Sequence, residues 1–261
     1  MKVLGDVSQK KYEIAVFIFS FNHKEYISQC VDSVIKQETD VNWHIFIHDD
    51  ASLDGTREIL LDYYEKYPER ITLLLQEENQ FQRGRPIGID LFEISKSEFI
   101  AFCEGDDFWI YNKKLRKQHK FMQKNPWCGV LHSGVKIINQ NGWTEYFNNL
   151  RTILGKNHGK KRDSGSKLTH GNFIMTCSVL LRRSELPESL LESIGKLQPL
   201  DYILFSLATR FKDIGYQKKK MSVYRLHDSN YFASEHNALI TADYDQTREF
   251  LDFHSPYSFK S

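Results

Sequence analysis

The chain has 261 residues, with 35 Lys and Arg against 34 Asp and Glu, which leaves a formal charge of +1. With 41% hydrophobic and 26% charged residues, the composition is that of a globular protein and excludes a disordered or collagen-like chain. The near-zero charge gives no overall field for holding nucleic acid, so we expect no nucleic-acid partner.

The cysteines and the N-terminus indicate the compartment. The four cysteines show no CxxC spacing, and three of them lie in apolar runs (Cys30, Cys103, Cys128 and Cys177). They are predicted to be buried free thiols of a reducing compartment rather than a disulfide framework or a zinc site. The N-terminal residues lack the apolar region of a signal peptide, and no apolar run approaches the roughly 18 residues of a membrane span. We therefore expect a cytoplasmic protein.

In the first half of the chain, apolar strands alternate with amphipathic helices. Strands are predicted at 14–19, 43–47, 71–75 and 99–103. Helices with one apolar face are expected at 26–35 and from Asp54 to a stop at Pro68. This alternation predicts a parallel sheet covered on both faces, in which ligands bind beyond the carboxyl ends of the strands.

The second half has a different pattern. Strands are predicted at 128–138, 177–182 and 221–225, an apolar helix at 202–211 after Asp201, and a helix-prone tail. The polar, glycine-rich stretch 155–167 is either a loop over a site or a surface excursion. No internal repeat or linker divides the chain, so we predict one domain over residues 1–261.

An acidic motif follows the strand at 99–103. Glu104, Asp106 and Asp107 place three carboxylates within four residues. Like charges this close raise each other's pKa unless a cation neutralises them, and hard oxygen ligands favour Mg²⁺ or Mn²⁺. The alternative is a turn whose acids cap the following helix. The motif is therefore a candidate metal site.

Weaker candidates lie earlier in the chain. Asp49 and Asp50 end the second predicted strand, but the residues after them are rich in turn and N-cap types, which favours a structural role equally. Arg83 and Arg85 flank Gly84 in a loop, where they either meet phosphate oxygens or are solvated. Lone histidines such as His44 and His48 are predicted to be packed or surface residues.

Three motifs together resemble the family 2 glycosyltransferases. They are the strand 16–22 followed by a helix ending at 32–37, the acidic segment 47–56, and the segment 99–109, in which Glu leads the metal-binding acids. These motifs occur in the family's order and spacing and cover about residues 12–125. The later segments 198–205 and 223–227 match more loosely.

The resemblance implies an α/β fold of GT-A (Rossmann-like) type, with a mostly parallel central sheet flanked by helices. Residues of about 12–125 would form a nucleotide-sugar-binding half and residues of about 126–261 an acceptor-binding elaboration. It further implies a nucleotide-diphospho-sugar donor, usually UDP-linked, a divalent metal (Mn²⁺ or Mg²⁺) and inversion at the anomeric carbon. The acceptor would be a hydroxyl of a glycan or a lipid-linked saccharide, which leaves peripheral attachment at the inner face of a membrane open. The Gln-x-x-Arg-Trp motif of processive members is absent, which favours single additions.

Carried over by position, the resemblance assigns roles to individual residues. Asp50 would accept the uracil N3–H. The metal would be held against the diphosphate by Asp106 and Asp107, with Glu104 in support. The remaining donor-binding candidates are Ser20, Asn22 and Glu25 around the nucleoside, Arg83 or Arg85 at the base or diphosphate, and Arg225.

Two late segments carry further predictions. Arg225 and His227 are expected at the diphosphate or metal, with a strand-end pair in a surface turn as the alternative. Asp201 is the predicted catalytic base, because it precedes an apolar helix as the family's late acid does; a helix N-cap is the compatible structural interpretation. Asp163 and Glu185 are the reserve candidates for the base.

Two rival functions are weighed against this one. A sugar-phosphate nucleotidyltransferase shares the sheet and the metal, but it needs a glycine-rich phosphate loop after the first strand, and residues 20–25 contain no glycine. A nucleotide-sugar or glycan-binding module that has lost turnover would also retain the acids. A donor-hydrolysis assay separates the two, because a binding module releases no nucleotide diphosphate.

Overall fold

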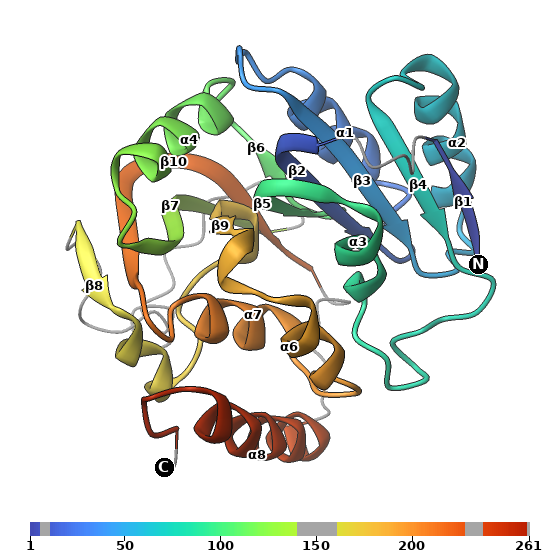
Figure 1. Ribbon diagram of the computed structural model, residues 1–261. Helices are drawn as coiled ribbons and strands as arrows, with labels where there is room; N and C mark the ends of the chain where they lie inside the picture. The colour runs from blue at the N-terminus through green and yellow to red at the C-terminus, as the bar shows by residue number, and fades with distance from the viewer. Residues whose placement is uncertain (6–10, 140–160, 228–236, 260–261) are drawn as a thin grey trace.

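The structure, a computed structural model, describes residues 1–5, 11–139, 161–227 and 237–259. Among these residues ten strands form one sheet, in the order β1-β4-β3-β2-β5-β9-β7-β10-β6, with β8 pairing to β10 (Figure 1). The strands are β1 (Lys2–Leu4), β2 (Lys11–Ser20), β3 (Trp43–Asp49), β4 (Ile71–Leu75), β5 (Lys96–Glu104), β6 (Phe108–Trp109), β7 (Cys128–Asn139), β8 (Arg162–Ser164), β9 (Leu180–Arg182) and β10 (Asp213–Leu226).

The sheet is parallel where the nucleotide half was predicted and mixed beyond it. Strands β4, β3, β2 and β5 run parallel, as do β7 and β10. The short strands β1, β6, β8 and β9 pair antiparallel to their neighbours. Strands of both predicted halves thus belong to one sheet.

Helices cover both faces of the sheet. One apolar cluster packs under α1 (Ile27–Ile35), α2 (Thr56–Lys66) and α4 (Lys114–Lys124). The other packs under α3 (Ile89–Ile94), α6 (Glu188–Ser193), α7 (Leu200–Ala208) and α8 (Asn237–His254). The central strands are apolar on both sides because both of their faces are buried, which is the expected property of a parallel sheet. All four cysteines are buried and free, as predicted.

The structure corrects several predicted elements in the second half. The predicted strand at 177–182 starts as a 3₁₀ turn (Thr176–Ser178), and strand β9 begins only at Leu180. Residues 162–170 form β8 and a 3₁₀ helix (Gly165–His170) rather than a loop, while residues 155–160 lie outside the described residues. A third 3₁₀ turn spans Arg183–Glu185. Strand β10 is far longer than predicted, because pairing with β7 and β8 extends the polar residues 213–220 that have no apolar pattern of their own.

Candidate active site

The carboxyl ends of three neighbouring strands meet at one edge of the sheet. Ser20 at the end of β2 lies opposite Asp49 of β3, and Phe19 lies opposite Glu104 of β5. The pairing continues beyond the strands, where the Asp50 N–H donates to the Ser20 carbonyl at 2.9 Å. The acid-rich loops after β3 and β5 therefore flank the loop after β2.

The predicted metal motif begins at the last residue of β5, Glu104, and continues into the loop before β6, which contains Asp106 and Asp107; we call residues 104–107 the acid loop. Asp106 and Asp107 are buried, and Glu104 is half-buried. Asp107 Oδ1 accepts a hydrogen bond from the backbone N–H of Arg225 on β10 at 2.8 Å. Asp107 Oδ2 is buried and has no hydrogen-bond partner among the described residues. Because buried polar atoms are normally paired, this oxygen is available to a ligand.

Two of these carboxylates are electrostatically unfavourable as ions. Burial first, and then the negative charges of Asp107 and Asp106, raise the pKa of Glu104 well above its usual range. Burial and the charge of Asp106 likewise raise the pKa of Asp107, against the lowering effects of the Arg225 N–H bond, the nearby Cys177 thiol and the charge of Arg225. A bound cation would relieve both.

Asp106 differs from its two neighbours because two histidines face it. His227 Nε2 lies 2.9 Å and His23 Nε2 lies 3.9 Å from Asp106 Oδ2. Burial acts to raise the pKa of Asp106, but the His227 hydrogen bond and the charges of both histidines outweigh it, and the pKa is lowered. Tyr26 stacks on the His227 ring at 5.2 Å between centroids. Protein groups therefore hold Asp106 in place.

His23 is a residue of this site that no sequence motif indicated. It follows β2 by three residues, and its Nδ1 is buried without a hydrogen-bond partner among the described residues. Burial lowers the pKa of His23 by more than the charge of Asp106 raises it. The available signal was position, because a polar residue just beyond the first strand of a parallel sheet lies at the ligand-binding edge.

Arg225 on β10 hydrogen-bonds to the acid loop. Its Nε donates to the Asp106 carbonyl at 2.9 Å, and its Nη2 donates to Gln29 Oε1 at 2.7 Å. The guanidinium carbon lies 4.7 Å from the Tyr26 ring centroid and 5.4 Å from that of Phe108. Arg225 is buried, as is His227, so this strand end is not a surface turn.

The donor atoms of the acid loop fit a hard divalent cation. Among the described ranges, no three His, Cys, Asp or Glu side chains are already gathered as a metal ligand set. The atoms offered are nevertheless carboxylate oxygens, which Mg²⁺ and Mn²⁺ prefer. The main evidence for a cation here is Asp107 Oδ2, which is buried and has no hydrogen-bond partner among the described residues.

The predicted acid pair after β3 separates into two roles. Asp50 is buried, and its carboxylate accepts the backbone N–H groups of Gln80 at 2.7 Å and Phe81 at 3.1 Å. Burial raises the pKa of Asp50 against these two bonds. Asp49 instead forms an ion pair with Arg57 at 2.8 Å. Asp49 is thus structural, and Asp50 anchors the loop after β4.

The loop after β2 is fastened to the loop after β3. The Asn22 N–H donates to Ser52 Oγ at 2.9 Å, and Asn22 Oδ1 accepts from the Leu53 N–H at 2.9 Å. Asn22 has a φ of 54°, in the left-handed region that Asn tolerates. Ser20 is buried with an unpartnered Oγ within the described part of the chain, whereas Glu25 is exposed. Asn22 therefore shapes the loop, and Ser20 offers a hydroxyl.

Arg83 and Arg85 lie in the loop that Asp50 anchors. Arg83 pairs with Glu78, and Arg85 pairs with Asp90 in the first turn of α3. The Arg83 side chain is 60% exposed and the Arg85 side chain 47%, so pairing leaves both accessible to a ligand.

Asp201 is held by three hydrogen bonds in the first turn of α7. Its Oδ2 accepts from Asn172 Nδ2 at 2.7 Å and Thr176 Oγ1 at 3.3 Å, and its Oδ1 accepts from the Tyr202 N–H at 2.8 Å. The N-cap interpretation is wrong, because the helix begins at Leu200. Burial raises the pKa of Asp201 against these bonds.

Asp201 lies within electrostatic range of Glu104, and the reserve candidates do not share its setting. The charge of Asp201 is among the causes that raise the pKa of Glu104, so the two carboxyls lie within electrostatic range. Asp163 and Glu185 are both in ion pairs with lysines. Asp163 lies beside the start of β10, whereas the acid loop lies at its end.

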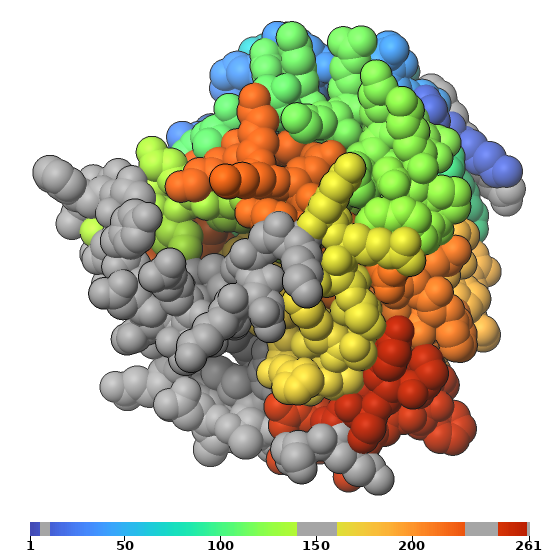
Figure 2. Space-filling model, turned by 90° about the vertical axis from the view of Figure 1, so that its left-hand side faces the viewer, coloured from blue at the N-terminus to red at the C-terminus, as the bar shows by residue number. Residues whose placement is uncertain are grey.

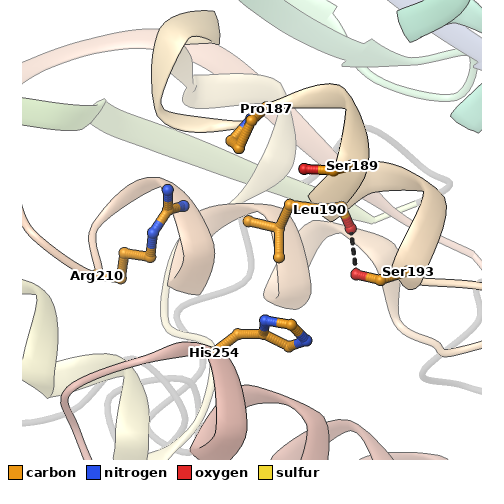
Figure 3. A pocket seen from close by; sticks show the side chains of 6 residues that line it. All are labelled: Pro187, Ser189, Leu190, Ser193, Arg210 and His254. Carbon is orange, nitrogen blue, oxygen red and sulfur yellow. Dashed lines mark hydrogen bonds between the residues drawn. The ribbon is translucent and has the colours of Figure 1, made fainter.

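A separate hollow of about 390 Å³ lies between α6 and the end of α8, away from the strand ends (Figure 3). Arg210, Leu190 and His254 point into it, and the Ser193 hydroxyl bonds to the Leu190 carbonyl at 2.7 Å on one side. The lining contains no carboxylate. We therefore assign the chemistry to the strand ends and not to this hollow.

Solved structures share this fold. S. aureus TarS residues 1–349, in complex with UDP, is similar over 93% of this chain and 65% of that one, with a TM-score of 0.63 and 16% identity. The mannosyltransferase PcManGT from Pyrobaculum calidifontis is similar over 88% of this chain and 61% of that one, with a TM-score of 0.57 and 18% identity. The predicted GT-A fold is confirmed.

Sequence comparisons agree. An uncharacterized protein of Mycobacterium tuberculosis is 29% identical over 219 residues, 82% of this chain and 59% of that protein. The Escherichia coli glucosyltransferase WfgD is 31% identical over 174 residues, 66% of this chain and 61% of WfgD. The chain thus spans about three fifths of the length of these curated relatives. The model of the family described as "Glycosyl transferase family 2" matches residues 15–187, a segment that includes both acid loops. The chain therefore belongs to this family.

Proposed function

We propose that this chain is an inverting, metal-assisted glycosyltransferase that moves a hexosyl group from a UDP-linked donor to a hydroxyl of a glycan or lipid-linked acceptor. Family membership supports sugar transfer from a nucleotide sugar. The name of WfgD gives that relative a UDP-Glc donor and a diphosphoundecaprenol-linked acceptor, and TarS has been solved with UDP-GlcNAc. The observation that carries the proposal is the unsatisfied acid loop beside Asp201.

On the donor side, the loop that Asp50 anchors would hold the nucleoside. Each carboxylate oxygen can accept two hydrogen bonds, so the backbone bonds to Asp50 leave capacity for the uracil N3–H. The Ser20 hydroxyl is free to meet the nucleoside beside Asn22, and Glu25 would lie at the rim. Arg83 or Arg85 would hold the base or the diphosphate.

The acid loop would hold the divalent cation through Asp106 and Asp107, with Glu104 in support and His227 as a further candidate ligand. When bound, the cation would neutralise the charge of the leaving UDP. The raised pKa values of Glu104 and Asp107 support this assignment, because a nearby positive charge favours their ionised forms. Arg225 would keep the loop in place through its contacts to Asp106.

Asp201 is the proposed catalytic base. It would take the proton of the acceptor hydroxyl as that oxygen attacks the anomeric carbon from the face opposite the UDP. The bonds from Asn172 and Thr176 fix one carboxylate oxygen, and a raised pKa makes the group a better proton acceptor. Its electrostatic proximity to Glu104 fits a sugar lying between the base and the diphosphate.

The test is UDP release from a panel of UDP-sugars, with Mn²⁺ or with excess chelator. We expect release to need the metal and to stop in Asp107→Asn, while Asp163→Asn, a change to an acid outside the site, leaves the rate unchanged. Full activity in chelator would contradict metal assistance. A folded protein that binds UDP-sugars and releases no UDP would instead be a binding module.

A further inference from the structure

One face of the molecule gathers positive charge. Seven exposed lysines lie on it, and we call them the lysine face: Lys117, Lys120, Lys124, Lys161, Lys218, Lys219 and Lys220. Figure 2 looks onto this side, where α4 (green), β10 (orange) and β8 (yellow) meet. None of the seven forms an ion pair with another described residue. Because the whole chain carries only +1, this charge is a local concentration.

Local structure turns these lysines outward. The register between β7 and β10 shifts between Gln217 and Lys220, so Lys218 and Lys219 have no partner residue on β7. A bulge of this kind leaves its residues out of the ladder and redirects their side chains. On α4, the lysines follow a spacing of three, four and seven residues, which brings them to one side of the helix.

The lysine face has an aromatic floor and an apolar rim. A hollow of about 400 Å³ is lined by four of the lysines around Phe121 and Tyr216. At the edge, Ile110 is 47% exposed, and its N–H donates to the Met221 carbonyl at 2.9 Å, next to Lys220. An exposed aliphatic side chain therefore lies next to this part of β10, and Lys219 Nζ lies 3.6 Å from the ring centroid of the neighbouring Tyr111.

We propose that the lysine face docks this chain onto an anionic lipid bilayer. The arginines at its border, Arg116 and Arg162, form ion pairs with Asp40 and Asp213, so the cations of this face without an ion pair to another described residue are all lysines. Flexible point charges suit a mobile array of head groups, whereas a discrete phosphate on a soluble chain favours a bidentate arginine. The exposed Ile110 gains from an apolar phase, which a bilayer offers.

The placement also relates the bilayer to the candidate active site. No helix in the described ranges is long and apolar enough to cross a membrane. Lys220 precedes Arg225 on β10 by five residues, at most about 17 Å of extended strand. A docked bilayer would thus lie close to the acid loop, while docking itself does not depend on the proposed sugar transfer.

Co-sedimentation with vesicles tests the proposal. Wild-type protein should bind phosphatidylglycerol–phosphatidylcholine vesicles, with binding that falls steeply with salt, and should not bind pure phosphatidylcholine. Each lysine contributes about fivefold in partitioning, so Lys218→Gln, Lys219→Gln and Lys220→Gln together should weaken binding about 100-fold. The matched control changes Lys2, Lys66 and Lys196 to Gln, which removes the same charge elsewhere and should leave binding near wild type. Ile110→Ser should weaken binding more modestly.

Two outcomes would overturn the proposal. Equal losses in the two triple variants would mean that overall charge and not this face is responsible. Binding of the wild type to soluble polyphosphate but not to phosphatidylglycerol vesicles would mean that the face recognises a dissolved polyanion. UDP release measured without vesicles should be unchanged in both triple variants, so a failure of docking is distinguishable from a failure of the proposed activity.

Discussion

Two acid-rich segments lie at the ends of β3 and β5, on either side of β2, and their carboxylates have different surroundings. After β3, Asp49 is paired with Arg57, and Asp50 accepts two backbone N–H groups. After β5, Asp107 keeps one buried oxygen without a partner among the described residues, and Glu104 has its pKa raised by burial and by its acidic neighbours. The protein gives Asp49 a cationic partner, although Asp49 Oδ1 is also buried without a hydrogen-bond partner among the described residues. Glu104 and Asp107 form no ion pair with another described residue.

The difference separates structural from functional carboxylates. A buried carboxylate costs free energy unless it is paired or hydrogen-bonded. Where the chain itself supplies a cation, as Arg57 does at Asp49, the acid stabilises the fold. Where the chain supplies no cation, as at Asp107, the carboxylate is a candidate for binding a ligand that neutralises its charge.

The largest effect on activity is expected at Asp201, whose charge is among the causes that raise the pKa of Glu104. Asp201→Asn should lower kcat by about 10²–10⁴-fold while donor binding is retained, because the amide cannot take the acceptor proton. Steady-state kinetics with a UDP-binding measurement would check this. Near-normal turnover in a folded variant would place the base elsewhere.

The activity of wild type should also follow the ionisation of Asp201. Because burial raises its pKa above the ordinary value, the base is protonated over a wider acidic range. The rate of transfer should therefore rise with pH through that raised pKa, and the acidic limb of the pH–rate profile should lie above the usual range of an aspartate. A profile that is flat across the acidic range would contradict the assignment.

The two loops should respond oppositely to loss of charge. Asp49→Asn breaks a buried ion pair whose arginine is partly exposed, so it should cost about 2 kcal/mol of unfolding free energy. Asp107→Asn removes an unfavourable charge while its Oδ1 can still accept the Arg225 N–H, so stability should hold or rise as activity is lost.

Denaturant unfolding and UDP release on both variants would measure this contrast. Each variant serves as the control for the other, because both convert a buried aspartate at the same sheet edge to asparagine. A large loss of stability in Asp107→Asn would mean that its carboxylate is satisfied after all.

Asp50 should show an intermediate effect. Asp50→Asn replaces an acceptor by an amide that can present a donor to the uracil N3–H, so UDP affinity should fall about 10- to 100-fold. Calorimetry would measure it, and thermal unfolding would report whether the loop after β4 is still anchored. Unchanged UDP affinity would exclude the uracil contact.

The smallest effect concerns a buried cation. Lys114 is fully buried, with Nζ 3.3 Å from the Val179 carbonyl, and burial lowers its pKa to about 7. Above pH 7 the unfolded state binds more protons than the folded state, so this group makes stability rise with pH, by at most about 1.4 kcal/mol per pH unit. Lys114→Met should flatten that slope in denaturant unfolding between neutral and alkaline pH. An unchanged slope would assign it to other groups.

The first half of the fold could be predicted from sequence because its signals are local. The apolar runs that became β2 to β5 are long and bounded by polar residues, and both faces of the sheet bury them. The polar part of β10 carried no such pattern, because its pairing with β7 across the chain determines its conformation. Long-range pairing of this kind is invisible to periodicity.

The candidate site was predictable where the chain itself places its residues together. Glu104, Asp106 and Asp107 are adjacent in sequence, so their clustering required no folding. His23 and His227 meet Asp106 because two distant strands end at the same edge; His227 was expected there through the family resemblance alone, and His23 was not expected. The separate roles of Asp49 and Asp50 depend on Arg57 and on the loop after β4, which the sequence does not pair with them.

The most direct measurement is a calorimetric titration of UDP with and without Mn²⁺, on wild type and on Asp107→Asn. If the acid loop after β5 is the metal and diphosphate site, Mn²⁺ should strengthen UDP binding in the wild type, and the gain should disappear in the variant. Equal UDP affinity of the wild type with and without Mn²⁺, or a gain that survives in Asp107→Asn, would contradict that assignment.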